Sequence, residues 1–345
     1  MARSTRRGIS RMATRMADEP TRVNLTSAAI PAEGFDGSWE RKGRSPNSAA
    51  LAGLLGVGII YFYGQGFLVS IALLGTGGHL AGESEGFFQE LTRIAELTKN
   101  PVRTCLILSQ FLLMLWPTWW LVRRWHTSDV RGYIRLNYSS TVQVVLAFCT
   151  VLLLFPTNIL ISEFFINRLS IPEEMVRINE AIVTASSGGE FVFVVLVIAV
   201  TPAICEEVLF RGYAQRTFER TMGWKSIIVV GVLFGLYHMQ PLGLLSLSGL
   251  GLLFGYFFFA SKSLVPGMVA HFTNNFLVVL WMYLRETQRM PISLRAGHLM
   301  PVVMLVTLPS AAIAIYAFHR ASVRTGSPET VPPPEGQAKD PGGMP

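Results

Sequence analysis

Residues 191–211 have the sequence FVFVVLVIAVTPAICEEVLFR, which joins two features that are rarely found together. The run from Phe191 to Cys205 contains no charged side chain. Glu206, Glu207 and Arg211 then follow within the same segment. A helix that crosses a hydrocarbon core of about 30 Å needs about 20 mostly apolar residues. The segment therefore predicts a membrane span that has ionisable side chains in it or at its end.

Apolar stretches of similar length occur on both sides of this one. They lie at 49–75, 104–122, 141–161, 226–240, 242–261, 264–284 and 301–318. The stretch at 226–240 is the shortest and is closed by Pro241, so we expect a partial or tilted span there. The fold class that we predict is all-α, a polytopic transmembrane helix bundle of about eight spans.

The composition of the 345-residue chain agrees with a membrane protein. It is 50% hydrophobic and 15% charged, which is more apolar than soluble proteins usually are. The formal net charge of +7 would suggest nucleic acid as a partner of a soluble protein. The Lys and Arg residues, however, fall in the tails and in short loops beside apolar runs, which is typical of membrane orientation. We therefore expect the lipid bilayer, and no nucleic acid, as a partner.

Basic residues that set the orientation precede the first span and follow the second and the fourth. They are Arg41, Lys42, Arg44, Arg123, Arg124, Arg131, Arg135, Arg211, Arg216, Arg220 and Lys225. This pattern predicts that both termini face the cytoplasm, and we expect a bacterial cell membrane. Arg285, Arg289 and Arg295 disagree, because an even number of spans would put them outside. Either the count differs by one or this loop is an exception.

The two ends of the chain are polar. Residues 1–47 begin with an arginine-rich run and predict a disordered basic cytoplasmic tail, with an organellar transit peptide as the alternative. Residues 321–345 are rich in Pro and Gly and predict a second disordered tail. Between them we expect N-terminal transmembrane helices at 48–135, a core at 136–285 and a last transmembrane helix at 286–320.

Ionisable side chains in a bilayer cost about 2.5–3.5 kcal/mol each, so they need a compensating partner or a function. Glu207 and Arg211 are one helical turn apart and are expected to form an ion pair. Glu206 projects about 100° away from Glu207 and has no local partner. Such a carboxylate can take a proton from water, as a general base does.

Two further segments supply groups that suit the same chemistry. His271 and Asn275 are four residues apart, so an imidazole and a carboxamide project from one helix face. Fixed hydrogen-bond donors of this kind suit the oxyanion that develops in amide hydrolysis. His238, on a separate helix, could orient a water molecule against Glu206. Together these residues would provide a base, a water holder and an oxyanion hole.

Plainer interpretations exist for each of these residues. A single histidine in a membrane is usually an interhelical hydrogen-bonding group, Asn274 and Asn275 could bridge helices, and Glu207 with Arg211 could be an interfacial pair. Pro202, four residues before Glu206, frees backbone groups, which is common where a span lines a watery cavity. The occurrence of all these groups in one chain favours the functional interpretation.

Metal binding is an alternative, since Glu206, His238 and His271 could hold zinc. The chain has no HExxH motif, and we expect no cofactor. A serine or cysteine nucleophile is disfavoured, because there is no GxSxG motif and Cys205 has no basic neighbour.

Three motifs resemble those of the CAAX protease and bacteriocin-processing family, which includes the type II CAAX prenyl endopeptidases. Glu206, Glu207 and Arg211 correspond to EExxxR, Phe234 and His238 to FxxxH, and His271 and Asn275 to HxxxN. The resemblance covers about residues 140–285 and implies an eight-helix intramembrane endopeptidase of the glutamate type, with its protease core at 136–285.

By this resemblance, Glu206 would act with His238 on water, while His271 and Asn275 would form the oxyanion hole. Glu207 and Arg211 would support the site. The substrate implied is a membrane-associated peptide or protein, which in some members of the family is lipidated. Two other functions stay open: a transporter or proton-relay protein, and a non-catalytic immunity or scaffold protein. A transporter would favour an inverted internal repeat, of which the sequence shows no sign.

Overall fold

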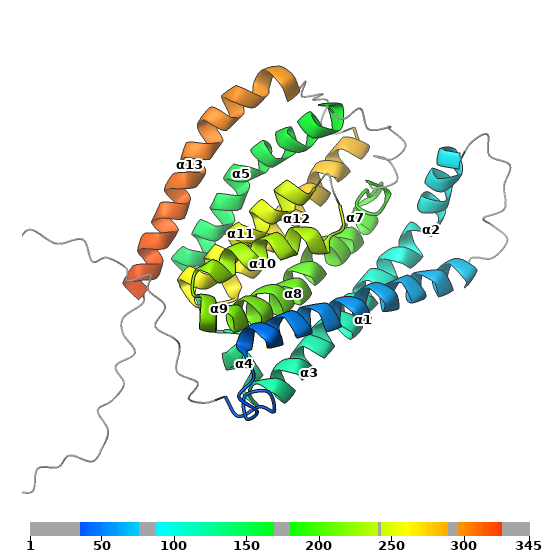
Figure 1. Ribbon diagram of the computed structural model, residues 1–345. Helices are drawn as coiled ribbons and strands as arrows, with labels where there is room; N and C mark the ends of the chain where they lie inside the picture. Colours follow the sequence, from blue (N-terminus) through cyan, green and yellow to red (C-terminus); the bar gives the residue numbers. More distant parts are fainter. Residues whose placement is uncertain (1–34, 76–86, 169–179, 241–242, 289–295, 326–345) are drawn as a thin grey trace, which may run out of the picture.

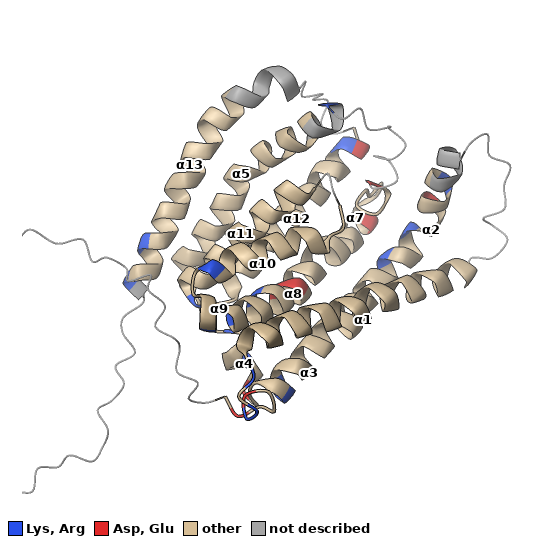
Figure 2. Cartoon of the chain, in the orientation of Figure 1, with Lys and Arg blue, Asp and Glu red and all other residues tan. Residues whose placement is uncertain are grey.

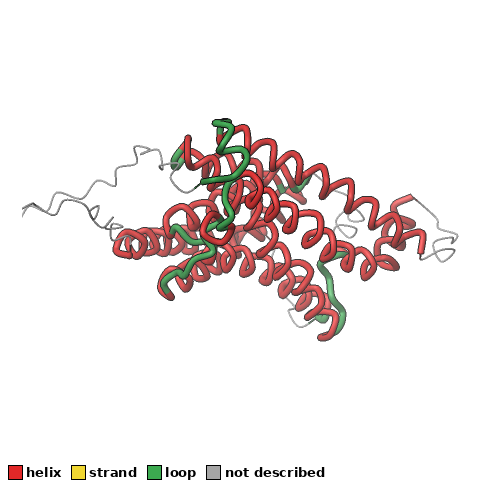
Figure 3. Tube along the Cα trace, turned by 90° about the horizontal axis from the view of Figure 1, so that it is seen from below, coloured by secondary structure: helices red, strands yellow, loops and turns green. Residues whose placement is uncertain are grey.

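The computed structural model describes residues 35–75, 87–168, 180–240, 243–288 and 296–325. Every regular element in these ranges is helical, and no strand occurs in them (Figures 1 and 3). The predicted all-α fold class is thereby confirmed. Three π-helical segments, labelled η, lie within two of the long helices: η1 follows α2, and η2 and η3 flank α8. The elements are α1 (Pro46–Gly75), α2 (Phe87–Ser109), η1 (Gln110–Leu115), α3 (Trp116–Trp125), α4 (Val130–Tyr133), α5 (Thr141–Arg168), α7 (Gly188–Val195), η2 (Leu196–Val200), α8 (Thr201–Glu207), η3 (Val208–Gln215), α9 (Arg216–Met222), α10 (Lys225–Tyr237), α11 (Leu244–Ser261), α12 (Val265–Glu286) and α13 (Ala296–Thr325).

Within the described ranges, 7 helices are long and apolar enough to cross a membrane. They are Pro46–Gly75, Thr92–Trp125, Thr141–Ser162, Gly188–Met222, Leu244–Ser261, Val265–Glu286 and Val302–Arg324. The stretch at 226–240, expected to be the shortest, forms helix α10 of 13 residues. At 1.5 Å per residue it is roughly 20 Å long, too short to cross the bilayer alone. The chain is an integral membrane protein close to the predicted count of eight spans.

The central helix continues further than the sequence indicates. Segments α7, η2, α8, η3 and α9 form one helix of 35 residues, Gly188–Met222. The sequence suggested an end near residue 210, with Arg211, Arg216 and Arg220 in a cytoplasmic loop, which differs from the structure. Two of these arginines can remain in the helix because they are paired with carboxylates. Arg211 lies 2.8 Å from Glu207, and Arg220 lies 2.5 Å from Glu40.

The other helices surround this central one. Helix α12 packs on α8 and η2, segment η1 packs on α8, and α1 packs on η1, η3 and α9 (Figure 1). Helix α5 packs between α12 and α13, while α10 pairs with α11. Glu206 and Glu207, near the middle of the central helix, are therefore enclosed by α12 and η1.

The α10–α11 pair depends on glycine. A Cβ atom on Gly251 would lie 2.6 Å from the carbonyl oxygen of Gly231, so the two backbones are in direct contact. The small-xxx-small spacing of Gly231 with Gly235 and of Gly251 with Gly255 thus serves packing within the chain. This contact holds the middle of α10 against α11, two helical turns before His238.

Residues 35–45, which the sequence placed in the polar tail, lie against α3. The Gly37 amide donates to the His126 carbonyl at 2.7 Å. Glu40 accepts hydrogen bonds from His126 Nδ1 at 2.6 Å and from both terminal nitrogens of Arg220 at 2.5 and 3.0 Å. Burial alone would raise the pKa of Glu40, but these hydrogen bonds outweigh burial and lower the pKa to about 2. The carboxylate is ionised at neutral pH and fastens this segment to the bundle.

Charges gather at the two ends of the bundle (Figure 2). Many Lys and Arg residues lie at the end that contains α3, α4 and α9. Arg285, which disagreed with the predicted orientation, lies at the opposite end and pairs with the Glu180 carboxylate. Arg289 and Arg295 lie outside the described residues.

Candidate active site

A cavity of about 390 Å³ lies beside the central helix. Its walls come from α1, α2, η1, η2, α8, α10, α11 and α12. Glu206, His238, His271 and Asn275, which the sequence analysis placed in one site, all line it. Glu207 and Arg211 do not line it but lie directly behind His271. The structure therefore brings the candidate residues together, while their chemical roles stay predictions.

Glu206 and His238 face each other across one side of the cavity. Nε2 of His238 lies 3.8 Å from Oε2 of Glu206. Nδ1 of His238 lies 2.8 Å from the Phe234 carbonyl oxygen, which can only accept a hydrogen bond, so Nδ1 is the donor. In the neutral imidazole, Nε2 then has the lone pair and faces Glu206. The two groups present two acceptors at a separation that one water molecule can bridge.

Glu207 has two partners, where the sequence indicated one. Its Oε1 lies 2.8 Å from Arg211 Nη1, as the spacing predicted, and 2.9 Å from His271 Nδ1. Because a carboxylate accepts, Nδ1 of His271 donates and Nε2 is the nitrogen left for the cavity. His271 is also stacked on Phe254, with ring centroids 5.1 Å apart. Its imidazole is thus fixed in position and orientation.

Arg211 is fully buried within the helix bundle. It has no exposed surface, and its Nη2 donates to the Gly251 carbonyl at 3.0 Å. Its guanidinium carbon lies 4.5 Å from the ring centre of Phe234 and 5.4 Å from that of Phe254. A carboxylate, a carbonyl and two aromatic faces together replace the water that this cation loses.

Asn275 is held by a backbone group that proline releases. Pro202 has no N–H, so the carbonyl of Ile198, four residues earlier, lacks its ordinary helical donor. Asn275 Nδ2 donates to this carbonyl at 2.8 Å, and Asn275 Oδ1 accepts from Asn274 Nδ2 at 3.0 Å. The interhelical role considered for Asn275 is therefore present. The second N–H of its carboxamide is not used by either bond.

The opposite wall has polar side chains from α1 and η1 that were not predicted from the sequence. Tyr61 and Gln65 lie on α1, and Gln110 lies on η1. The Nε2 atom of Gln110 is 3.5 Å from Glu206 Oε1. A signal was available, because an uncharged polar residue inside an apolar membrane span also needs a partner. The sequence prediction used this signal for Asn275 but not for Gln110.

A metal centre does not fit the donors that are present. The bonds of the two histidine Nδ1 atoms, to Phe234 and to Glu207, leave Nε2 of each ring available and do not by themselves argue against a metal. Among the described residues, however, no three His, Cys, Asp or Glu side chains come together as a metal site requires. We therefore derive no chemical step through a metal, and the expectation that no cofactor is needed stays a prediction.

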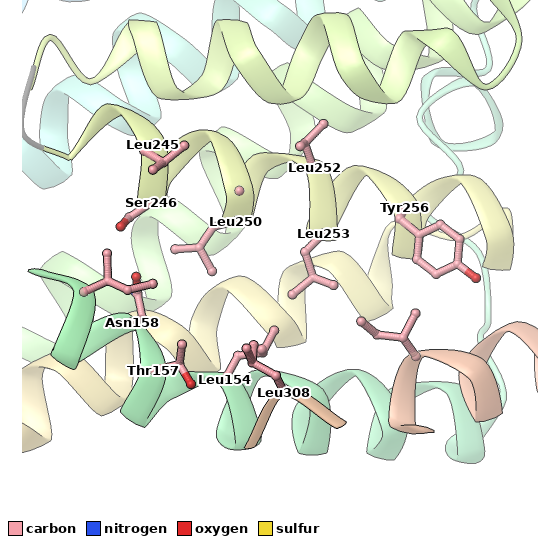
Figure 4. A pocket seen from close by; sticks show the side chains of 13 residues that line it. Leu154, Thr157, Asn158, Leu245, Ser246, Leu250, Leu252, Leu253, Tyr256 and Leu308 are labelled. Carbon is pink, nitrogen blue, oxygen red and sulfur yellow. The ribbon is translucent and has the colours of Figure 1, made fainter. Parts of the chain in front are cut away.

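A second, larger cavity of about 590 Å³ lies between α5, α11 and α13 (Figure 4). Leucine and isoleucine side chains make up most of its wall, and its polar groups are Thr157, Asn158, Ser246 and Tyr256. It contains no ionisable carboxylate or imidazole. Size alone would select this cavity, but it lacks the groups that hydrolysis needs.

Comparison with known proteins bears on the first cavity. Residues 188–277 match the family model described as type II CAAX prenyl endopeptidase Rce1-like. The match extends from α7 into α12 and includes Glu206, His238, His271 and Asn275, so the predicted resemblance to the CAAX protease and bacteriocin-processing family is confirmed for this segment. The match covers residues 188–277 of the 345-residue chain and supports a CAAX-type membrane protease domain in that segment. No curated protein matches the chain. No solved structure matches it either.

Proposed function

We propose that the protein is an intramembrane endopeptidase that hydrolyses a peptide bond near the membrane with water activated by Glu206. The observation that carries this proposal is the convergence of Glu206, His238, His271 and Asn275 on one cavity between membrane spans. The family match over the same segment supports peptide hydrolysis as the reaction.

The first step would activate water. A water molecule between Glu206 Oε2 and His238 Nε2 can donate one hydrogen bond to each, since both atoms are acceptors and lie 3.8 Å apart. Glu206 takes a proton as the water oxygen attacks the carbonyl carbon of the peptide bond. His238, fixed through its bond to Phe234, orients the attacking lone pair.

The second step would stabilise the oxyanion and release the amine. The free N–H of Asn275 and Nε2 of His271 are the donors available on α12. Since Nδ1 already donates to Glu207, Nε2 can donate to the oxyanion only when the ring carries a hydrogen on both nitrogens. When the tetrahedral intermediate collapses, the C–N bond breaks and the leaving amine takes the proton from Glu206. Glu207 and Arg211 would support the site by fixing His271.

The substrate and the cell compartment follow from the surroundings of the site. Because the cavity lies among membrane spans, we propose a membrane-associated peptide or protein, lipidated or not. The cations at the end that contains α3, α4 and α9 support a cytoplasmic location for that end and for both termini. We propose the bacterial cell membrane as the location.

The test is cleavage by the purified full-length protein in detergent. A panel of prenylated and unprenylated peptides is incubated with the wild type and with Glu206→Gln, and the products are identified by mass spectrometry. We expect the variant to lose at least about 100-fold in kcat, because it cannot accept the proton. Glu96→Gln, on a half-exposed side chain paired with Lys99, is the matched control and should keep full activity. Wild-type turnover by folded Glu206→Gln would overturn the proposal.

Two further arms separate the alternatives. Cleavage should persist in the presence of a chelator, and a loss that zinc restores would instead support a metal-dependent mechanism. If the panel yields no cleavage but proteoliposomes show a proton flux that Glu206→Gln abolishes, the proton-relay function is correct and the peptidase is not.

A further inference from the structure

Gln110 occupies an unusual position for an amide. It begins η1, on the long helix that also contains α2 and α3, outside the residues that match the family model. Its side chain is 6% exposed and lines the cavity that contains Glu206. The next residues are apolar, and Phe111 and Leu112 face outward, as expected for a membrane span. An amide buried among them is costly unless it is bonded.

The two carboxylate oxygens of Glu206 have different neighbours, and Gln110 is the neighbour of Oε1. Gln110 Nε2 is 3.5 Å from Glu206 Oε1, at the outer limit of a hydrogen bond, while Glu206 Oε2 faces His238. The reverse orientation of the amide would set an oxygen against the carboxylate, so the nitrogen is correctly directed. Oε1 of Gln110 is buried and has no hydrogen-bond partner among the described residues. A side-chain hydrogen bond also links Gln110 to Tyr61, so Glu206 is one of two side chains bonded to this amide.

The backbone of η1 explains how this side chain reaches Glu206. A π-helical turn adds a residue to the turn and redirects the side chains around it, and such turns are frequent at functional sites. Segment η1 packs directly on α8, which contains Glu206. The Gln110 amide and the Glu206 carboxylate therefore meet across two helices that are far apart in sequence.

We propose that Gln110 is a positioning residue for Glu206: its amide N–H holds Oε1, so that Oε2 is directed at His238 and the water. The inference rests on the proposed hydrolase function and adds a residue that lies outside the matched segment. It predicts that the general base loses its orientation when the amide is removed, although Glu206 itself is intact.

The decisive variant is Gln110→Met, measured in the same peptide assay with the full-length protein. Methionine has a similar length, so the span should stay folded, and removal of a poorly satisfied amide should leave the melting temperature equal or higher. We expect kcat to fall by about 10-fold to 100-fold with little change in KM, because misdirection of a reacting group acts on the chemical step. Unchanged kcat in Gln110→Met would overturn the inference.

A pH profile separates positioning from a purely structural role. Gln110→Glu puts a second carboxylate beside Glu206 and should move the acid limb of kcat to higher pH, because like charges disfavour ionisation. The other titratable or charged groups that face Glu206 are His238, Tyr61, Tyr237, His271, Cys205 and Arg211. They are identical in wild type and variant, so the shift reports the new carboxylate. An unmoved acid limb would contradict a direct contact between positions 110 and 206.

Gln143→Met is the control for loss of a buried glutamine. Gln143 is 3% exposed on α5, donates to Ser322 and does not line the cavity. This variant should lower the melting temperature and keep kcat, the opposite of the result for Gln110→Met. If wild type cleaves, Glu206→Gln is inactive and Gln110→Met behaves as wild type, the inference fails and the proposed function remains. If Glu206→Gln cleaves as well as wild type, the proposed function fails too.

Discussion

Two cavities lie on either side of α11, and the larger one is the less polar of the two. The larger, between α5, α11 and α13, is walled by leucine and isoleucine. The smaller, beside α8, contains a glutamate, two histidines and two asparagines. Leu250 lines both, so one helix separates an apolar cavity from one lined by ionisable side chains. The difference teaches that a candidate site in a membrane bundle is better selected by its buried polar side chains than by its volume.

The largest effect should come from breaking the support behind the reactive cavity. Arg211→Met leaves the Glu207 carboxylate buried with one partner fewer and removes the bond to the Gly251 carbonyl. We expect the protein to lose about 3–5 kcal/mol of stability, the usual cost of an uncompensated buried charge, together with its activity. Unfolding in detergent, followed by circular dichroism, measures this loss. Arg285→Met, which breaks an ion pair with a half-exposed arginine, should cost less than about 1 kcal/mol. Equal losses of stability for the two variants would contradict a larger contribution of the buried Arg211–Glu207 pair than of the Arg285–Glu180 pair.

The next largest effect is expected on kcat, from a comparison of one asparagine in each cavity. Asn275→Ala removes the carboxamide proposed for the oxyanion and should lower kcat by about 10²–10³. Asn158→Ala, in the apolar cavity, should leave the rate of peptide hydrolysis unchanged. Peptide cleavage followed by mass spectrometry compares the two variants. If both slowed hydrolysis equally, the division between the cavities would be wrong.

The smallest effect is expected on stability alone, from alanine substitutions on the two faces of α11. A Cβ atom on Gly251 would lie 2.6 Å from the Gly231 carbonyl, so Gly251→Ala should cost about 1–3 kcal/mol through forced separation of α10 and α11. A Cβ atom on Gly249, which lines the apolar cavity, would meet no atom within 4 Å. Gly249→Ala should therefore be neutral or gain up to about 1 kcal/mol from helix propensity. Melting temperatures of the two variants check the difference, and a destabilised Gly249→Ala would show that this face is packed more tightly than described.

The spacing of residues along single helices predicted much of the fold and part of the site. The pairing of Glu207 with Arg211 follows from a separation of one helical turn, and the apolar runs indicated the spans. The bond between His271 and Glu207 joins residues 64 apart, and the contact of Gln110 with Glu206 joins residues 96 apart. Helical periodicity contains no information on such contacts, because they depend on how the helices pack. The π-helical segments were missed for the same reason, since tertiary packing and not local propensity stabilises them.

The bond between Asn275 and the Ile198 carbonyl has a consequence for how the reaction begins. An asparagine side chain on a lone helix samples several rotamers, and freezing it during turnover would add to the activation barrier. Here a helix interruption in one span immobilises an amide in another before any peptide arrives, so the entropy is lost during folding. In the proposed mechanism the carboxamide dipole would already be oriented when the oxyanion charge forms, so no solvent-like reorganisation would be needed. Pro202 would then contribute to the proposed reaction indirectly, by leaving the Ile198 carbonyl open to Asn275.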